Sequence, residues 1–538
     1  MRVCCRDIEL PLEATPDPKP AIEKKLQDNL QIRDIGEFKI VRRALDARRN
    51  RPRYKYTVEF ELDHALANKL IAAKKVEAVQ TKKRETWRLS SPPDGPRPVI
   101  IGAGPAGLFA ALTLAEGGWA PIIIERGKAV KERGRDVSRL YSKGELNPES
   151  NVCYGEGGAG TYSDGKLYTR VNDPRFRHLL RALVKNGAPE RILIDTRPHI
   201  GTDKLIKLLQ SLREYLESLG TVFRFETAAD SFEVRDGQLR ALILRDGERI
   251  ETHHAIVATG HSAHAMWHAL ERAGAELEAR PFAVGFRIEH HQDQINAVRY
   301  GQEANNEYLP AADYKLVHNN EERGVYSFCM CPGGVVVTTP TRPKELCING
   351  MSHAAREGKY ANSAMVVTVG PEDFAAMGHT GTFAGAAFQR EVEARAYQAG
   401  GGQYVAPAVT VSDFMAGQVK GNLGLTSYRR GITPFPIWEL YPEVVSTTLR
   451  EGLGRFDRKM RGFVTAEARL IGVETRTASQ VRVLRDPTTR QSTGIEGLYP
   501  VGEGMGYGGG IASAAIDGIR SADALLEHVG AVSEEVPV

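Results

Sequence analysis

The sequence predicts an α/β protein in which a Rossmann-type βαβ region is split by a mixed α+β region and preceded by a small α+β region. Three observations predict this class. A glycine-rich βαβ pattern begins at Val99, an apolar strand with a second glycine-rich turn spans residues 497–511, and a proline-rich linker, SSPPDGPRP, closes the first 90 residues. At 538 residues the chain is too long for a single hydrophobic core. We therefore expect two or three domains.

Residues 1–95 alternate strand-like and helix-like patterns, which is typical of a small α+β domain. VCCRDIEL is expected to be a strand, AIEKKLQDNL and residues 64–73 are expected to be helices, and FKIVRRAL with YKYTVEFEL reads as a hairpin around Arg49–Pro52. Residues 1–98 hold 22 Lys and Arg against 15 Asp and Glu, a net charge of +7, so this region could attract RNA or another acidic partner. It lacks an aromatic-rich RNA-binding motif, so we do not favour nucleic acid as a partner.

The segment VIIGAGPAGLFAALTLAEGGWAPIIIERG, residues 99–127, has every part of a dinucleotide-binding βαβ unit. Gly102 permits the tight turn after the strand, Gly104 lets a pyrophosphate approach the backbone, and Gly107 lets the helix pack closely on the strand. The phosphate groups then lie at the positive end of the helix. Glu125 ends the second strand, where its carboxylate can accept hydrogen bonds from ribose hydroxyls. An acid there disfavours a 2′-phosphate, so the pattern indicates FAD or NAD.

Two later segments favour FAD. AIVATGHSA is an apolar strand that ends in Ala258, Thr259 and Gly260, and GLYPVGEGMGYGGGI is a strand that ends in Gly502 and Glu503 before a further glycine cluster and a helix. Together with the βαβ unit they resemble the FAD-binding domain of two-domain flavoproteins. That resemblance implies that Glu503 bonds the ribityl chain, and that the helix start at Gly509, Gly510 and Ile511 points at the flavin.

The motifs GEGGAGTYSDGKLYTR, FAVGFRIEHHQ, VYSFCMCPGG, ANSAMVVTV and GVETRTASQVRVLRD resemble the uncharacterised bacterial FAD-dependent dehydrogenase family. This family is related to single-dinucleotide-fold flavoproteins of the glutathione-reductase superfamily, and the resemblance covers nearly the whole chain. It implies FAD and an oxidoreductase activity, with no agreed substrate.

On this basis we expect an N-terminal α+β domain at residues 1–95, an FAD-binding domain at 97–279 that is completed by residues 486–530, and a substrate or cap domain at 280–485. The cofactor-binding residues are expected to be Gly102, Gly104, Pro105, Ala106, Gly107, Glu125, Arg126, Gly158, Ala159, Ser163, Gly165, Lys166, Ala258, Thr259, Gly260, Gly502, Glu503, Gly509, Gly510 and Ile511.

The stretch GTYSDGKL resembles a Walker A loop, but Leu167 stands where that loop needs Ser or Thr for Mg²⁺. No strand pattern precedes Gly160, and Pro174 follows before a helix could be established. We expect instead that the glycines of residues 155–165 let backbone wrap around the isoalloxazine ring of FAD. Lys166 is then a candidate cation for the N1–C2 side of that ring, and a surface lysine is the alternative.

Four further residues are candidates for catalysis. Arg287 and Arg476 could clamp an anionic substrate, with salt bridges to Glu289 or Glu474 as the alternative. Cys329 and Cys331 could exchange electrons as a disulfide, or one could act as a thiolate; two core thiols are the alternative. A Cys-x-Cys pair in a regular strand places both side chains on one face. No Cys/His set has metal-ligand spacing, so no metal is expected.

The favoured function is an FAD-dependent oxidoreductase that transfers hydride between a small organic substrate and flavin N5. The alternatives are an RNA-modifying flavoprotein that uses the basic N-terminal domain, and a non-catalytic FAD-binding or electron-transfer protein. A second βαβ fingerprint is missing, so the electrons come from the substrate, a transiently docked NAD(P)H or a protein donor. We expect a cytoplasmic protein without a membrane-spanning segment, and a disordered C-terminal EEVPV.

Overall fold

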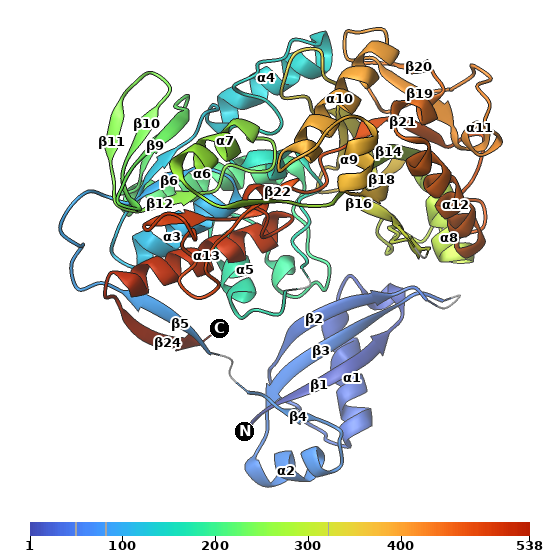
Figure 1. Ribbon diagram of the computed structural model, residues 1–538. Helices are drawn as coiled ribbons and strands as arrows, with labels where there is room; N and C mark the ends of the chain where they lie inside the picture. Colours follow the sequence, from blue (N-terminus) through green and yellow to red (C-terminus); the bar gives the residue numbers. More distant parts are fainter. Residues whose placement is uncertain (49–50, 81–82, 170, 321, 538) are drawn as a thin grey trace.

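The structure is a computed structural model that describes residues 1–48, 51–80, 83–169, 171–320 and 322–537. A small N-terminal unit stands below two larger, closely packed regions in Figure 1. One of these regions is built on a parallel sheet and the other on a larger, mainly antiparallel sheet. No helix in the described ranges combines the length and the apolar character needed to cross a bilayer.

The N-terminal unit has the order β-α-β-β-α-β, and its antiparallel sheet runs β2-β3-β1-β4, which is the arrangement of the ferredoxin-like fold. Its strands pack their apolar side chains against the helices, as the alternating pattern predicts. The predicted hairpin joins β2 and β3, and its tip at Arg49 and Asn50 lies outside the described residues. The elements are β1 (Arg2–Leu10), α1 (Pro18–Leu30), β2 (Phe38–Asp46), β3 (Arg53–Glu61), α2 (His64–Ala72) and β4 (Glu77–Ala78).

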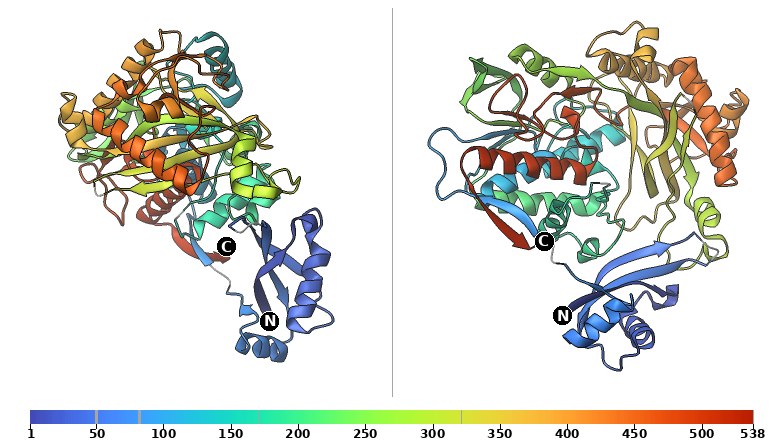
Figure 2. Two further views of the ribbon diagram at one scale, coloured as in Figure 1. Left: turned by 90° about the vertical axis from the view of Figure 1, so that its right-hand side faces the viewer. Right: turned by 60° about the horizontal axis from the view of Figure 1, so that its bottom comes forward.

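The edge of β2 connects this unit to the rest of the chain. The backbone N–H of Arg43 donates to the carbonyl of Ile194 at 2.7 Å, and the Arg43 side chain pairs with Asp195 at 2.7 Å. Tyr54 of β3 also donates to the Tyr308 carbonyl at 3.2 Å, and Figure 2 shows the unit at the bottom of the molecule in both views.

The C-terminal tail is a strand, so the expectation of disorder was wrong for residues 534–537. β24 (Val532–Pro537) pairs antiparallel with β5 (Lys83–Arg88), and Lys83 Nζ lies 2.7 Å from Glu535. Because β5 supplies a free edge far away in sequence, the strand formed by a polar tail could not be read from the tail itself.

The parallel sheet has the order β23-β12-β6-β7-β8, and all four strand pairs in it are parallel. The strands β23, β12 and β6 are buried on both faces, as expected for such a sheet, whereas the edge strand β8 is partly exposed. Ile100 and Ile123 pack towards α3, α5, α6 and α13, while Ile101 and Ile124 face a three-stranded meander and α7. The strands are β6 (Val99–Ile101), β7 (Ile122–Ile124), β8 (Val222–Arg224), β12 (Ala255–Val257) and β23 (Leu498–Pro500), and the meander is β9 (Ala229–Arg235), β10 (Gln238–Leu244) and β11 (Arg249–Glu251).

Helices α3 and α13 lie side by side on one face of this sheet (Figure 1). A Cβ on Gly518 would stand 2.1 Å from the Ala106 carbonyl oxygen, so the two helices are in backbone contact. The helices of this region are α3 (Pro105–Glu116), α4 (Val130–Lys143), α5 (Arg175–Lys185), α6 (Thr202–Ser218), α7 (His264–Ala273) and α13 (Ile511–His528).

The third region is built on one sheet of the order β15-β16-β18-β14-β21-β19-β20, in which β17 pairs with β16. The strands expected at FAVGFRIEH and GVVVTTP are present in β14 and β16. The strands are β14 (Phe282–His291), β15 (Val317–Asn319), β16 (Gly324–Thr338), β17 (Ile348–Met351), β18 (Tyr360–Val369), β19 (Ala406–Thr410), β20 (Ile432–Pro434) and β21 (Arg469–Glu474).

Five helices pack around this sheet, and a two-stranded ribbon joins it to the parallel-sheet region. The helices are α8 (Gln292–Tyr300), α9 (Pro371–Ala376), α10 (Ala384–Ala399), α11 (Val411–Ala416) and α12 (Glu443–Lys459), and the ribbon is β13 (Leu277–Ala279) with β22 (Val481–Val483). The domain bounds proposed above remain predictions, because strand pairing shows only which segments share a sheet.

Candidate functional site

The three glycines of the first turn have three different surroundings. Gly102 has φ +108°, and a Cβ there would stand 2.5 Å from the Ala258 carbonyl oxygen. A Cβ on Gly107 would stand 1.9 Å from the Gly102 carbonyl oxygen, so any side chain would push α3 off β6. A Cβ on Gly104 would meet nothing nearer than the Gly158 Cα at 3.9 Å and would project into an open cleft. These surroundings fit the turn, packing and approach roles that the spacing predicts.

Two helices begin at this cleft. α3 starts directly after Gly104, and α13 starts directly after Gly510, which has φ +78°. Residues of both first turns line the cleft, including Pro105 and Ile511. The unpaired N–H groups and positive dipole ends of two long helices are therefore directed at one space, which favours a bound anion there.

Glu125 is buried and lines the same cleft. Its carboxylate accepts hydrogen bonds from the backbone N–H groups of Ala103, Gly127 and Gly155, each at 2.9 Å. One side chain thus joins the first glycine turn to the loop at residue 155. The neighbouring Arg126 stacks over Tyr154 at 4.1 Å and pairs with Glu149 at 2.7 Å.

Arg133 holds the glycine-rich loop of residues 151–161 in place. Its side chain is fully buried on α4, and its guanidinium donates to five backbone carbonyls at 2.6–3.3 Å, those of Asn151, Val152, Gly155, Glu156 and Gly158. Burial lowers the pKa of this guanidinium. The sequence analysis missed Arg133, although a signal exists: it lies on the buried stripe of α4 between Val130 and Val137, where an apolar residue is expected.

The cleft collects nearly all of the expected cofactor residues. All of them line it except Gly107, Gly165, Gly502 and Gly509. Gly107 and Gly502 lie against neighbouring residues of the fold, and a Cβ on Gly502 would stand 2.9 Å from Ala106 Cβ. Gly165 packs against Gly201, and Gly509 lines a second cavity that adjoins the cleft.

The second cavity shares one part of its wall with the cleft, and we call this shared wall the junction. The junction is formed by Lys166, Phe328, Cys329, Thr477, Glu503, Gly510 and Ile511. It therefore brings together the loop after residue 155, strand β16 and the start of α13. From the junction the second cavity extends between the two large regions, past Tyr314 and Tyr507.

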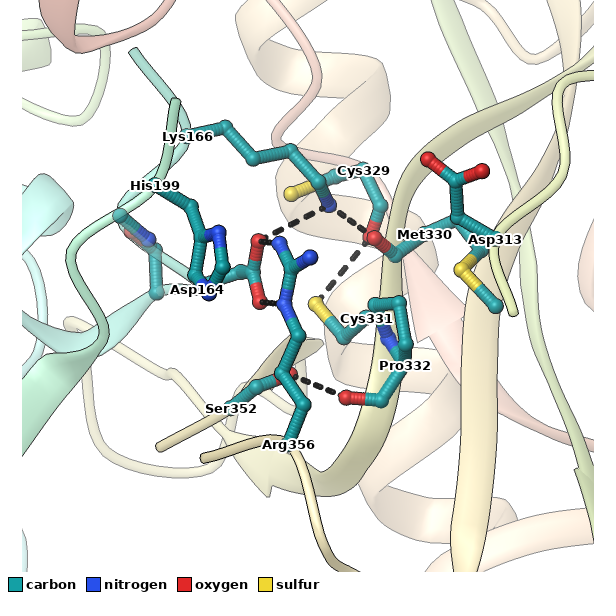
Figure 3. A network of polar contacts seen from close by, with 12 residues as sticks. Asp164, Lys166, His199, Asp313, Cys329, Met330, Cys331, Pro332, Ser352 and Arg356 are labelled. Atoms are coloured by element: carbon teal, nitrogen blue, oxygen red, sulfur yellow. Dashed lines mark hydrogen bonds and ion pairs between the residues drawn. The ribbon is translucent and has the colours of Figure 1, made fainter. Parts of the chain in front are cut away.

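Lys166 and Glu503 are the charged groups of the junction. Lys166 Nζ donates to the Met330 carbonyl and lies 3.6 Å from Asp164, which Arg356 also binds through two nitrogens (Figure 3). Burial opposes the charge of Lys166, but the negative charges of Cys331 and Cys329 in their thiolate form and of the Asp164 carboxylate raise its pKa above the ordinary value. Burial raises the pKa of Glu503 to about 7, against the effect of a hydrogen bond from the Gly510 N–H.

Cys329 lies on a bulge of β16. The register of β16 against β18 shifts between Phe328 and Cys331, and Cys329 has φ +47°, which is unusual for a residue with a side chain. The two cysteines therefore do not sit on one face of a regular strand, and both are free thiols. A hydrogen bond from the Cys331 thiol, and then the charges of Lys166 and Arg287, lower the pKa of Cys329 against the opposing effect of burial.

The two candidate arginines are held in buried ion pairs. Arg287 pairs with Glu474 at 2.7 Å and also donates to the Cys329 carbonyl at 2.6 Å, so it lies behind the junction. Arg476 pairs with Glu393 at 2.7 Å and donates to Thr341 at 2.9 Å, although part of its side chain lines the cleft. Both arrangements match the salt-bridge alternative, with Glu393 as a partner that the sequence did not suggest.

Comparison with known proteins connects this geometry to flavoproteins. Residues 281–477 match the family model described as "FAD-dependent protein, C-terminal domain-like". A protein of Clostridium beijerinckii, described only as uncharacterized, is 40% identical over 540 residues, which cover 98% of this chain and 99% of that protein.

Solved structures resemble the chain only distantly. L-amino acid deaminase from Proteus vulgaris is 11% identical over 84% of this chain and 96% of that chain, with a TM-score of 0.32. The flavin-dependent brominase Bmp2 is 10% identical over 80% and 79%, with a TM-score of 0.36. CtdE in complex with FAD is 12% identical over 81% and 84%, with a TM-score of 0.32. Superpositions this loose carry no argument about the site.

Proposed function

This chain belongs to one family with its Clostridium relative, and because residues 281–477 match the C-terminal domain of FAD-dependent proteins we propose that it is an FAD-dependent oxidoreductase. FAD would extend along the cleft from the first glycine turn, with its isoalloxazine ring at the junction, in the manner of the glutathione-reductase superfamily. The observation that supports this proposal is that the cleft lined by the first glycine turn and by the starts of α3 and α13 adjoins a second cavity at the junction.

The residues present fit FAD. Thr259 Oγ1 is buried in the cleft wall and has no hydrogen-bond partner among the described residues, so a polar group of a ligand can satisfy it. The bare backbone of Gly104 leaves space where a side chain would block the cleft. The N-terminus of α3 lies at this turn and the N-terminus of α13 at the junction, which suits a ligand with a diphosphate in one half and a polar ring in the other.

Each group of residues then has a distinct task. Glu125 would accept hydrogen bonds from the adenosine ribose, the start of α3 would bind the diphosphate, and Glu503 would bond the ribityl chain. Lys166 would place a positive charge near the N1–C2 side of the ring and favour its reduced, anionic form. When bound, FAD supplies a hydride acceptor at N5.

The second cavity favours an enzyme over a purely electron-carrying protein. It starts at the junction and offers space for a small molecule next to the ring position. We propose that a small organic substrate enters there, and that electrons come from this substrate or from a transiently docked nicotinamide.

The RNA-modifying alternative has less support. On the ferredoxin-like unit several basic side chains are already paired with acids: Arg2 with Glu59, Arg6 with Glu77 at 2.8 Å, and Lys55 with Glu9 at 2.9 Å. Such pairs lower the positive potential that a phosphate backbone would need.

We also propose a cytoplasmic location, which agrees with the six free thiols.

The test is anaerobic reduction of the FAD-loaded protein. Small organic acids, alcohols and amines, and NADH or NADPH, are each mixed with the protein while flavin absorbance is followed. We expect at least one organic compound to bleach the flavin faster than it bleaches free FAD. If the protein binds FAD but no compound bleaches it and dithionite alone does, the electron-transfer alternative replaces the proposal.

A further inference from the structure

We propose that the second cavity is a binding site for a small organic anion with an apolar or aromatic body. This inference rests on the proposed function, because it names the class of substrate that would meet the ring at the junction. It is carried by the charges and the aromatic side chains that line the cavity, most of which come from segments outside the cofactor cleft.

The charge in the cavity is positive and incompletely neutralised. Its basic residues are Lys166, Arg280, Lys315 and Arg482, whereas Glu503 is its only acid in the described part of the chain. Lys166 is paired with Asp164, and Arg482 with Glu278 at 3.0 Å. Burial raises the pKa of Glu503 to about 7, so this carboxyl carries only part of a negative charge at neutral pH. The single acid of the cavity therefore cancels only a small part of the charge of its cations.

Among the described residues, Arg280 and Lys315 are the cations of the cavity without an ion pair. The guanidinium of Arg280 donates one hydrogen bond, to the Gly506 carbonyl at 2.7 Å. Burial, and then repulsion from Arg482, lower the pKa of Arg280, while the nearby Glu278 carboxylate acts in the opposite direction. A carboxylate or phosphate in the cavity would relieve that repulsion and would gain charge-assisted hydrogen bonds.

The remaining wall is aromatic. Tyr168 is 47% exposed and Phe328 36% exposed, so both rings present surface that a ligand can cover. Both line this cavity, together with Tyr314 and Tyr507. Exposed aromatic surface inside a cavity gains free energy when an apolar body covers it. The cations thus favour a ligand with an anionic group, and the aromatic wall favours a ligand whose remaining part is apolar or aromatic.

Lys166 does not compete for this anion to the same extent. Its Nζ is already bonded to the Met330 carbonyl and paired with Asp164, and Arg356 holds Asp164 in place (Figure 3). Lys166 therefore faces the ring position, while Arg280 and Lys315 serve the substrate.

The experiment measures binding of three probes to the FAD-loaded protein by calorimetry: benzoate, its neutral isostere benzamide, and acetate, which lacks the aromatic body. We expect benzoate to bind about tenfold or more tightly than either of the others, with a preference over benzamide that declines at high salt. The double variant Arg280→Gln/Lys315→Gln should lose most of that preference and keep its FAD. The matched control, Lys204→Gln/Arg458→Gln, changes exposed cations on α6 and α12 and should bind like the parent protein.

Equal binding of benzoate and benzamide, no binding of either, or a preference unchanged in the double variant would overturn the inference. Benzoate is also added to protein without FAD, and the protection of Cys329 from alkylation by iodoacetamide is measured. This experiment separates the anion-site proposal from the FAD proposal. If the chain takes up no FAD but benzoate still protects Cys329, the cofactor proposal fails and the anion site stands. If FAD binds and benzoate neither binds nor protects, the anion site fails alone.

Discussion

The cofactor cleft and the second cavity meet at one junction, yet they are built from different parts of the chain. Glycines, helix N-termini and backbone N–H groups form much of the cleft, and the buried Glu125 in its wall and Arg133 behind its loop also bond to backbone atoms. The second cavity depends on side chains, with cations and aromatic rings brought from several distant segments. A site for an invariant cofactor can thus be fixed by backbone geometry, while the neighbouring substrate site is defined by side chains that can change.

Arg133, which holds the loop of residues 151–161 behind the cleft, is expected to be the most sensitive position. The substitution Arg133→Met leaves five buried carbonyls without their donor, so we expect a loss of about 3–5 kcal/mol in the free energy of unfolding and loss of FAD binding. Urea denaturation and FAD titration measure the two effects. Arg133→Lys should recover part of both, because one ammonium can reach some of these carbonyls. A methionine variant as stable as the parent would show that backbone anchoring does not hold the loop.

Substitutions of Gly107 and Gly104 should affect different properties, the stability of the fold and the affinity for FAD. In Gly107→Ala the new Cβ would stand 1.9 Å from the Gly102 carbonyl oxygen, so we expect a loss of about 1–3 kcal/mol in stability. In Gly104→Ala the Cβ meets no protein atom nearer than 3.9 Å, so stability should change by less than about 1 kcal/mol while FAD affinity falls about tenfold or more. Thermal unfolding and FAD titration of both variants provide the comparison. Unchanged FAD affinity in Gly104→Ala would contradict the cleft assignment.

Substitution of Lys166 tests whether the charge of this side chain at the junction affects the reduction potential of the isoalloxazine ring. Lys166→Met removes a positive charge, so we expect the two-electron midpoint potential of bound FAD to fall by about 30 mV, which corresponds to about 1.4 kcal/mol. Spectroelectrochemistry measures it. Asp164 keeps its partner Arg356 in this variant, which limits the structural damage. Lys166→Arg should keep most of the potential, and an unchanged potential in Lys166→Met would place Lys166 away from the ring.

Glu503 is tested by the pH dependence of stability rather than by activity or FAD affinity. Burial raises the pKa of its carboxyl to about 7 from an ordinary value near 4.5, so the folded state holds a proton that the unfolded state has released. Its contribution is complete below about pH 4.5 and is lost as the pH rises through 7. Glu503→Gln should flatten the stability profile of the FAD-free protein between these values. A profile identical to that of the parent protein would mean that Glu503 is ionised throughout.

The features that the sequence predicts well are local. Gly102, Gly104 and Gly107 lie within six positions of one another, and the strands β6, β7, β12 and β23 are short apolar runs that end at recognisable turns. Their roles follow from steric rules that involve only near neighbours.

The features that it does not predict depend on distant partners. β24 forms because β5 offers an edge, Arg476 is paired with Glu393 across 83 residues, and the bulge at Cys329 is visible only in the register of β16 against β18. The second cavity likewise gathers Lys166, Arg280 and Lys315 from three segments. A single sequence does not indicate which distant residues come into contact. The position of Arg133 on the buried face of α4 shows, however, that some polar core residues can be recognised.

The central claim is that FAD lies in the cleft between the first glycine turn and the junction. Titration of FAD into the purified, flavin-free chain, followed by flavin fluorescence and by gel filtration, tests it most directly. The account predicts saturation at one FAD per chain for the parent protein and clearly weaker binding for Gly104→Ala. A folded parent protein that takes up no FAD, or takes it up equally well with alanine at residue 104, would contradict it.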